Sequence, residues 1–366
     1  MSRLPARELS TLLKVSESLA VSLDLDRVLQ TAIESAVRVL QLKTGAIYLL
    51  DEEVLYLGAT TPPLPRNFPD EFRLANIGDH PHIRRAIRTH RTIYLADARE
   101  ARLSASEKAV SEARGLRSIL YIPLMLEQEP VGVLIVGSTH RLRRFTAHER
   151  SLCRILSSMI ALSVANARLF TSVQQASRAM TRAYDATLEG WSLALEMRDQ
   201  ATMGHTQRVT EMTLALAARM GIPKGSLEHI RRGALLHDIG KMAIPDSILS
   251  NTGRLSEHDW GIMQKHPELA YNFLLHIDYL LPVLDIPYCH HERWDGTGYP
   301  RGLKGEQIPL AARIFAVVDV FDALTSERSY RKAWPRQKAI DYIRRQSGKH
   351  FDPQVVAAFL KQLEAA

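Results

Sequence analysis

Hydrophobic and polar positions divide the chain into a mixed first part and a helical second part. In 9–23 and 28–40, apolar residues recur every three or four positions, which predicts two amphipathic helices. Short apolar runs between polar segments predict strands at 46–50, 54–59, 92–95, 118–126 and 131–138. The segment 127–130 between the last two runs predicts a hairpin turn. We therefore expect an α/β domain over 1–165.

The pattern changes near Thr146 and favours helix from there onward. Between Leu152 and Trp191, a seam of residues spaced by four and three runs without a proline. Such a heptad seam predicts a long helix, placed at 146–195, that pairs with its copy in a homodimer. The alternative is an ordinary amphipathic helix packed on its own domain. Further helical periodicity predicts an all-α domain over 177–366, with helices at 209–220, 227–236, 310–324 and 355–363.

Composition narrows the class of protein. The chain has 366 residues, a length typical of two domains. Two cysteines, Cys153 and Cys289, cannot build a disulfide framework, so we expect a protein of the reducing cytoplasm. The net charge of +7 is spread along the chain, which suits an anionic small ligand and does not favour nucleic-acid binding. Because no run of about 20 apolar residues occurs, no membrane span is expected.

Histidines and aspartates in the helical part form the candidate chemistry. Imidazole and carboxylate together suit divalent transition metals such as iron, manganese or zinc. Adjacent residues cannot face the same way on a helix, but a pair at a helix end can serve a metal site, or one member can bridge two metals. The alternatives are core histidines and, for Asp319, a salt bridge with Arg313. The candidate ligands are His205, His237, Asp238, His266, His290, His291 and Asp319.

The motifs around these residues, and the order in which they occur, resemble those of a known family. His237-Asp238-Ile-Gly-Lys241 is similar to the signature of the HD superfamily of metal-dependent phosphohydrolases, and Gly298-Tyr299-Pro300 is similar to that of its HD-GYP branch. Arg198-Asp199 with Thr202 and His205 resembles the opening motif of that branch. Asp319-Val-Phe-Asp322, followed by Arg328, Tyr330 and Arg331, resembles its closing motif. The match extends over about 177–363.

This resemblance implies an enzyme that hydrolyses the bacterial second messenger cyclic di-GMP to pGpG, or onward to GMP. It implies two divalent metal ions, iron or manganese, held by the seven residues named above, with Asp238 bridging them. Asp238 and Lys241 would be catalytic. Lys241 would stabilise the phosphate or protonate the departing ribose oxygen. Arg328, Arg331 and Tyr299 would bind substrate, and Asp199 and Thr202 would brace the first metal-binding histidine.

One position departs from the family pattern. Some members carry a glutamate four residues before the first metal-binding histidine, where it helps to hold a third metal ion. In this chain that position is Ala201, preceded by Gln200. We therefore expect two metal ions.

The N-terminal part resembles a GAF domain, which implies an antiparallel sheet with helices and a sensory pocket or dimerisation role. The resemblance is carried by 118–124, 130–137 and 145–149. The ligand of the domain is not readable. Haem would need an axial histidine, and five are available, each expected at the surface: His80, His82, His90, His140 and His148. Cys153 is expected in the core.

The leading hypothesis is a cyclic di-GMP phosphodiesterase regulated by its GAF domain. The first alternative is a catalytically silent HD-GYP module that binds nucleotide or recruits a protein partner through the loop around Tyr299. The second is a hydrolase of another cyclic dinucleotide.

Overall fold

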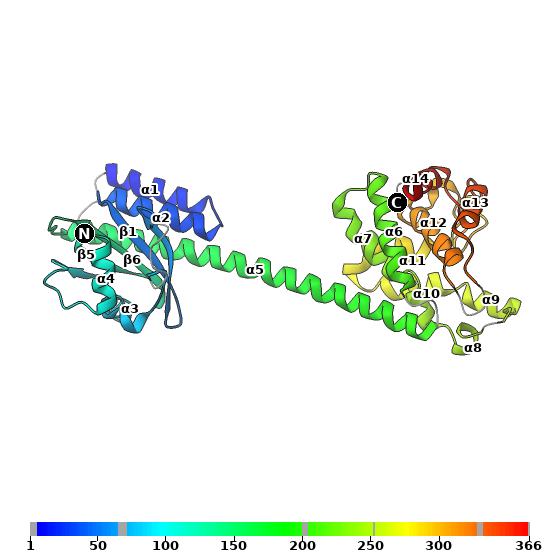
Figure 1. Cartoon of the computed structure of the whole chain (residues 1–366), viewed down its shortest axis with the longest axis horizontal. Helices are drawn as coiled ribbons and strands as arrows, with labels where there is room; N and C mark the ends of the chain where they lie inside the picture. The colour runs from blue at the N-terminus through cyan, green and yellow to red at the C-terminus, as the bar shows by residue number, and fades with distance from the viewer. Residues whose placement is uncertain (1–5, 65–71, 200–203, 252, 328–331, 365–366) are drawn as a thin grey trace. The chain divides into compact units, whose positions relative to one another are not determined.

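The chain folds into two compact units, Met1–Arg178 and Ala179–Ala366. The computed structural model describes residues 6–64, 72–199, 204–251, 253–327 and 332–364 (Figure 1). The N-terminal unit is an antiparallel sheet with helices, and the C-terminal unit is helical. A long helix, α5 (Ala147–Asp199), belongs to both units. The expected fold class, α/β followed by a long helix and an all-α part, is confirmed. The expected functional limits, 1–165, 146–195 and 177–366, remain a prediction.

The sheet of the N-terminal unit has six strands in the order β3-β2-β1-β6-β5-β4, and all neighbouring pairs are antiparallel. The strands β5 and β6 form a hairpin in which Leu126 pairs with Glu129, and Glu127 turns the chain with a φ of 54°. The predicted hairpin is thus confirmed. The strands are β1 (Thr44–Asp51), β2 (Val54–Thr61), β3 (Leu74–Asn76), β4 (Ile93–Leu95), β5 (Leu116–Leu126) and β6 (Glu129–Thr139).

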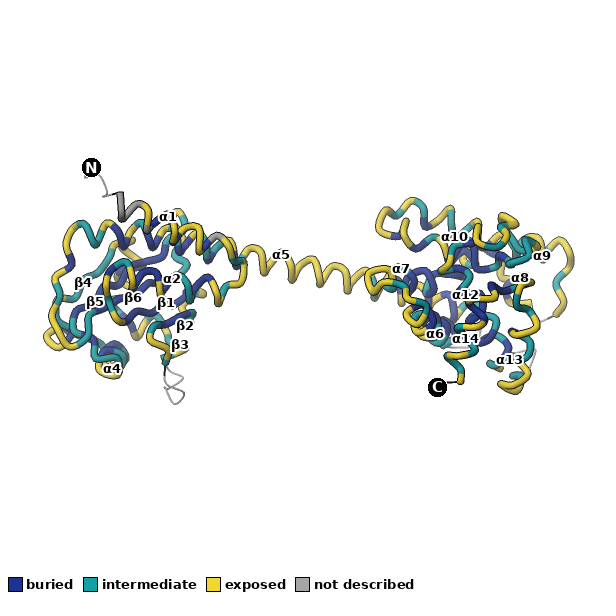
Figure 2. The backbone as a smooth tube through the Cα atoms, turned by 90° about the horizontal axis from the view of Figure 1, so that it is seen from above, coloured by how far each residue is buried: buried dark blue, intermediate teal, exposed yellow. Residues whose placement is uncertain are grey.

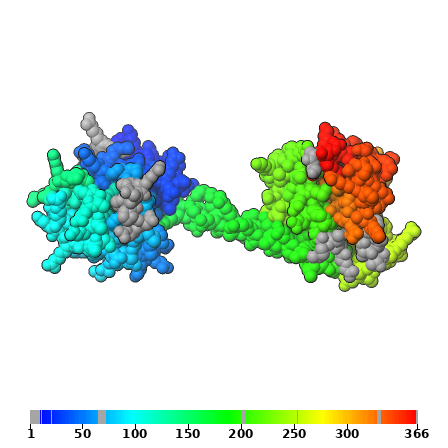
Figure 3. All heavy atoms as spheres, in the orientation of Figure 1, coloured from blue at the N-terminus to red at the C-terminus, as the bar shows by residue number. Residues whose placement is uncertain are grey.

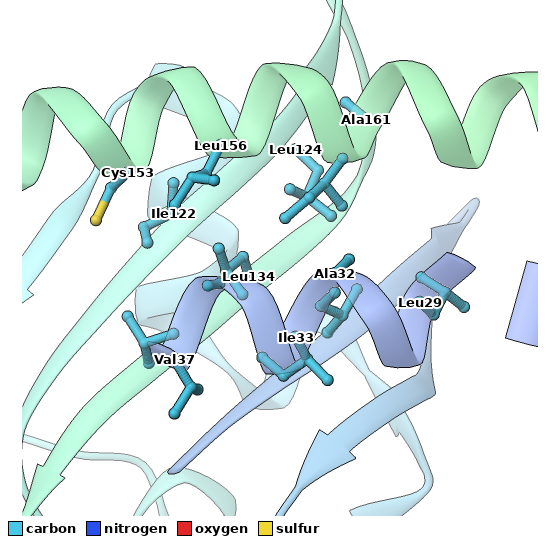
Figure 4. Packing of buried hydrophobic residues seen from close by; sticks show 14 of the residues in the cluster. Leu29, Ala32, Ile33, Val37, Ile122, Leu124, Leu134, Cys153, Leu156 and Ala161 are labelled. Carbon is cyan, nitrogen blue, oxygen red and sulfur yellow. The ribbon is translucent and has the colours of Figure 1, made fainter. Parts of the chain in front are cut away.

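Alternation along the strands gives the sheet two apolar faces. One face carries Ile47, Ile122 and Leu134 and packs against helices α1 (Ala6–Ala20), α2 (Leu25–Val39) and α5. Figure 4 shows side chains of α2, α5 and the strands pointing toward one another in this core. The opposite face carries residues such as Tyr121 and packs with residues of α3 (Pro81–Thr89). A further helix, α4 (Ala105–Ala113), begins with a capping box of Ser104 and Glu107.

Cys153 and Cys289 are free and buried. Burial raises the pKa of each thiol to about 12, so both thiols are protonated at neutral pH. Cys153 lies in the core cluster of the N-terminal unit, as expected. A protonated, enclosed thiol reacts slowly, which disfavours redox sensing by Cys153.

The heptad seam of α5 changes its environment along the helix. Leu152 and Leu156 are buried against the sheet, which is what the alternative of a helix packed on its own domain predicts. Residues 171–180 are all exposed; the middle of α5 has the colour of exposed residues in Figure 2 and is drawn as green spheres in Figure 3. Several large apolar side chains on this stretch and directly beside it are exposed: Leu169, Phe170, Val173, Met180 and Tyr184.

By length and composition alone, α5 could cross a membrane, so the expected absence of such a helix is not confirmed. Its apolar residues Leu152, Leu156, Ile160 and Val164 are buried in the core of the N-terminal unit. This burial is that of a core helix.

The C-terminal unit is built from helices around a core shared by α6, α7, α12, α13 and α14. A second cluster joins Leu188 of α5 to α7, α10 and the 3₁₀ helices η3 and η4. The α-helices are α6 (His205–Arg219), α7 (Lys224–Leu235), α8 (Asp246–Leu249), α9 (Glu257–Met263), α10 (His266–Leu274), α11 (Asp285–Cys289), α12 (Leu310–Thr325), α13 (Arg336–Arg345) and α14 (Pro353–Glu364). The 3₁₀ helices are η3 (Ile239–Ala243), η4 (Asp278–Val283) and η5 (Gly305–Gln307).

Candidate metal centre

The seven predicted ligands come from separate elements and meet in the C-terminal unit. His205 begins α6, His266 begins α10, and Asp319 lies in α12. The two adjacent pairs both lie at helix ends, where neighbouring side chains can turn to one site. His237-Asp238 lies between α7 and η3, and His290-His291 follows α11.

The ligands form two clusters. Asp238, His266, His290 and His291 offer one atom each within 4.8 Å of one another, and so do His205, His237 and Asp319. Asp238 faces both. Its Oδ1 lies 3.3 Å from Nε2 of His266, and its Oδ2 lies 3.1 Å from Nε2 of His237. The geometry therefore offers two neighbouring metal positions with Asp238 between them.

Hydrogen bonds at Nδ1 orient four of the histidines. His237, His266 and His290 each place Nδ1 within 2.8–3.0 Å of a backbone carbonyl oxygen, at Ala234, Met263 and Ile286. A carbonyl can only accept, so Nδ1 carries the proton and Nε2 offers its lone pair. His205 donates in the same way to Oδ2 of Asp322, at 2.7 Å. Metal-binding histidines are usually held like this.

The charge states of His290, His291 and Asp238 fit metal binding. Burial, together with His237 and His266, lowers the pKa of His290 to about 3. Burial also holds the pKa of His291 well below its usual value. Burial disfavours the charged form of Asp238, but Lys241 and His237 outweigh it and hold its pKa well below the usual value. Neutral imidazoles and an ionised carboxylate are the forms that ligate metals.

His205 has a different environment from the other histidines. Burial works against its protonation, but hydrogen bonds to Asp319 and Asp322 raise its pKa to about 9. Asp322 is 4% exposed and also receives a two-point contact from Arg208, at 2.8 and 3.0 Å. The sequence reading did not single out Asp322 as a site residue. Its spacing of three from Asp319 on one helix was the available signal.

Lys241 lies between two carboxylates. Its Nζ is 2.7 Å from Oδ2 of Asp238 and 2.9 Å from Oδ2 of Asp199. Asp199 thus braces Lys241, while Asp322 contacts the first metal-binding histidine, and a role of Asp199 at that histidine stays a prediction. Arg198 holds the same turn by donating to the carbonyl oxygens of Lys241, Met242 and Ile244.

The loop after His291 packs tightly on the ligand pair. The ring of Tyr299 stacks on that of His291 with centroids 4.7 Å apart, so Tyr299 contacts one of the candidate metal-binding residues. Gly298 has no room for a side chain, because a Cβ there would lie 2.3 Å from the backbone nitrogen of Arg293 and 2.6 Å from the carbonyl oxygen of His291. This close approach explains the glycine of the Gly-Tyr-Pro motif.

The alternative partner of Asp319 is engaged elsewhere. Nη1 of Arg313 lies 2.7 Å from Oδ2 of Asp352, so the proposed salt bridge to Asp319 is not formed. Three predicted site residues lie outside the described residues: Thr202, Arg328 and Arg331. Ala201, on which the expectation of two metal ions depends, lies outside them as well.

The N-terminal unit contains a cavity of about 30 Å³. Its wall is mainly apolar, with polar groups from Tyr48, His80, Glu107 and Tyr121. His80 is 8% exposed, so the expected surface position of this histidine is wrong. The volume suits about one or two water molecules. The cavity therefore does not identify the ligand of this domain.

Comparison with known families assigns both parts of the chain. Residues 22–165 match the GAF domain family, and residues 191–355 match the HD domain family. The chain is therefore a GAF domain protein with a C-terminal HD domain, and the resemblance to these families is confirmed.

Curated relatives match about half of this chain or somewhat more. The 3'3'-cGAMP-specific phosphodiesterase 2 of Vibrio cholerae is 36% identical over 63% of this chain and 42% of its own length. The cyclic di-GMP phosphodiesterase response regulator RpfG of Xanthomonas campestris is 42% identical over 48% of this chain and 47% of its own length. The chain thus spans less than half the length of these relatives. Among solved structures, the GAF domain of an Acinetobacter phosphoenolpyruvate-protein phosphotransferase is 18% identical, with a TM-score of 0.38, covering 47% of this chain and 99% of that one.

Proposed function

We propose that the protein hydrolyses cyclic di-GMP at a centre of two divalent metal ions in its HD domain. The observation that carries the proposal is Asp238, whose two carboxylate oxygens face two separate ligand clusters. His205, His237 and Asp319 would hold one ion, and His266, His290 and His291 the other, with Asp238 shared. When bound, two such ions supply Lewis-acid activation of water and of the phosphate.

Iron or manganese is the proposed metal. The clusters contain imidazole and carboxylate groups and no thiolate, a donor set that suits these ions. Two clusters support two ions per chain.

Lys241 would position the phosphate. An ammonium group has three donors, and Asp199 and Asp238 take two of them. No contact among the described residues takes the third donor, which would serve a phosphate oxygen or the departing ribose oxygen. Arg328 and Arg331 would hold further phosphate oxygens, since a guanidinium makes paired hydrogen bonds with phosphate. Tyr299 would border the substrate while it stacks on His291. The product would be pGpG, with a second cleavage giving GMP.

A second substrate candidate is 3'3'-cGAMP, another cyclic dinucleotide. It is supported by the relative from Vibrio cholerae whose name specifies that substrate and which matches 63% of this chain. The alternative of a catalytically silent module that recruits a protein at the Tyr299 loop is disfavoured by the complete set of seven candidate metal ligands.

The test is anaerobic purification followed by metal analysis and turnover. We expect about two iron or manganese ions per chain and hydrolysis of cyclic di-GMP, with 3'3'-cGAMP and cyclic di-AMP run in parallel. Faster hydrolysis of 3'3'-cGAMP would replace the proposed substrate. Two bound metals without turnover of any cyclic dinucleotide, across metals and redox states, would contradict the proposed reaction. A protein without metal would favour the silent module.

We also propose that the chain works as a cytoplasmic homodimer regulated by its GAF domain. The exposed seam residues of α5, such as Phe170, Val173 and Met180, leave apolar surface that a second copy of the helix would cover. A signal in the GAF domain would then shift helix pairing and change access to the metals.

Changing Val173 and Met180 to glutamate is expected to dissociate the homodimer. A carboxylate buried without a partner costs several kcal/mol, and each 1.4 kcal/mol weakens association tenfold, so we expect dimerisation to weaken by at least about a hundredfold. Sedimentation at several concentrations measures it. Gln175→Glu, an exposed position outside the seam, is the control. A monomeric wild type would refute the homodimer.

A further inference from the structure

Helix α6 begins without a cap of its own. Its N-cap residue is Gly204, which has a φ of 79° and no side chain to accept a hydrogen bond. The first backbone N–H groups of a helix have no partner within the helix and need an acceptor from elsewhere. This start matters because the first residue of α6 is His205, a candidate metal ligand with 8% exposure.

A carboxylate from another helix fills this role. Oε2 of Glu196 accepts from the backbone N–H of Gly204 at 2.9 Å, and Oε1 accepts from that of Thr206 at 2.6 Å. Glu196 lies near the end of α5 and is 7% exposed. Burial opposes its ionisation, but hydrogen bonds from Thr206 and Gly204 outweigh it and lower its pKa. The positive end of α6 also favours an anion here.

The two bonds of Glu196 flank one residue. Gly204 and Thr206 are the neighbours of His205 on either side, so the carboxylate fixes the backbone from which that imidazole projects. Asp322 fixes the same ring at its far nitrogen, Nδ1. His205 is therefore held at both its backbone and its ring, with Nε2 left 3.3 Å from Oδ1 of Asp319.

We propose that Glu196 is a positioning residue that sets the metal position formed by His205, His237 and Asp319. The proposal rests on the proposed metal centre and adds a residue outside the motifs described above. Because Glu196 belongs to the helix whose earlier residues are buried in the GAF domain, displacement of α5 at this end would change one metal position before the other.

The test is Mn²⁺ binding to the full chain, measured by calorimetry with Mn²⁺ alone. Glu196→Ala is expected to lower the affinity for one of the two ions about ten- to a hundredfold, the usual effect of removing a group that supports a metal ligand. Glu196→Gln keeps one acceptor for Thr206 and should fall between Ala and wild type. Glu189→Gln, on the same helix with its side chain 59% exposed, is the control and should match wild type. Turnover should show a lower kcat with little change in KM.

Two results would overturn the proposal. One is a folded Glu196→Ala protein that binds both ions with wild-type affinity. The other is an equal loss of both ions, which would indicate a general structural role. If Glu196→Ala does not fold, the Mn²⁺ affinities of Glu196→Gln decide, and wild-type affinity for both ions would again overturn the proposal. Because Mn²⁺ binding is measured without substrate, a wild type that binds two ions but hydrolyses no cyclic dinucleotide would refute the proposed reaction and still test Glu196.

Discussion

Asp238→Asn is expected to abolish hydrolysis and to remove at least one of the two metal ions. Asparagine keeps the size of the side chain but loses the negative charge and one of the two oxygens that face the two clusters. Metal ions contribute several kcal/mol to such reactions, and each 1.36 kcal/mol is a factor of ten, so the rate should fall about a thousandfold or more. Metal analysis and cyclic di-GMP turnover measure the two effects.

Asp341→Asn is the control for this change. Its side chain is 45% exposed on α13 and contacts only Arg344 among the ion pairs of the described residues, so metal content and turnover should stay at the wild-type level. Thermal unfolding separates lost chemistry from lost fold. Lys241 keeps its pair with Asp199 in the variant, which limits the destabilisation. If the Asp238→Asn variant retained both ions and wild-type turnover, Asp238 would not be part of the proposed centre.

Gly240→Ala is expected to destabilise the HD domain and disturb both metal positions. A Cβ at this position would lie 1.9 Å from the carbonyl oxygen of His266 and 2.6 Å from the backbone nitrogen of Ala270. Both atoms belong to the backbone of α10, so η3 and α10 would have to move apart. Overpacking of this kind costs about 1–3 kcal/mol. The movement would also separate Asp238 from His266.

Denaturant unfolding and Mn²⁺ binding check this prediction. Gly261→Ala in helix α9 is the matched control, because a Cβ there meets nothing within 4 Å. It should be neutral or stabilising by up to about 1 kcal/mol, since alanine favours helix over glycine. If Gly240→Ala were as stable as wild type and bound Mn²⁺ normally, the close approach of η3 to α10 would not constrain the site.

The sequence predicted the long elements of the fold better than the short ones. The strands β1, β5 and β6 are long apolar runs, and β5 and β6 are joined by a clear hairpin turn. All three were predicted. The predictions did not include β3, which has three residues, or α3 and α4, which have nine each. The three-residue strand β4 was predicted, at 92–95, but short elements in general contain too few turns or alternations to produce a period, so tertiary packing decides most of them.

The candidate ligands could be named from the sequence because each is a chemically distinctive residue, and all but His266 lie in or beside a recognisable motif. The residues that hold these candidate ligands in place could not be predicted. Glu196 and Asp322 reach His205 from α5 and α12, and Asp322 is 117 residues away in the chain. Such contacts depend on how helices pack, and the spacing of three between Asp319 and Asp322 indicates only that both lie on one face of a helix. The same holds for Asp199, whose partner is Lys241 on another element.

The seam of α5 was predicted as one continuous pairing surface, and the structure divides it. Its first turns belong to the core of the N-terminal unit, because Leu156 is fully buried there. The apolar residues farther along, such as Val173, lack such a cover in the single chain. A period in sequence specifies a face of a helix, but it does not specify what covers that face.

The uncovered stretch of α5 also makes the chain vulnerable to proteases. Residues 171–180 have no buried side chain, so their opening is opposed mainly by helix hydrogen bonds and requires little free energy. Arg178 lies within this stretch and Arg182 just beyond it, and trypsin cleaves after arginine. A single cut would leave two separately folded halves and end any control of one over the other. In a paired helix the same bonds would be shielded, so the cleavage rate would report how much of the protein is assembled.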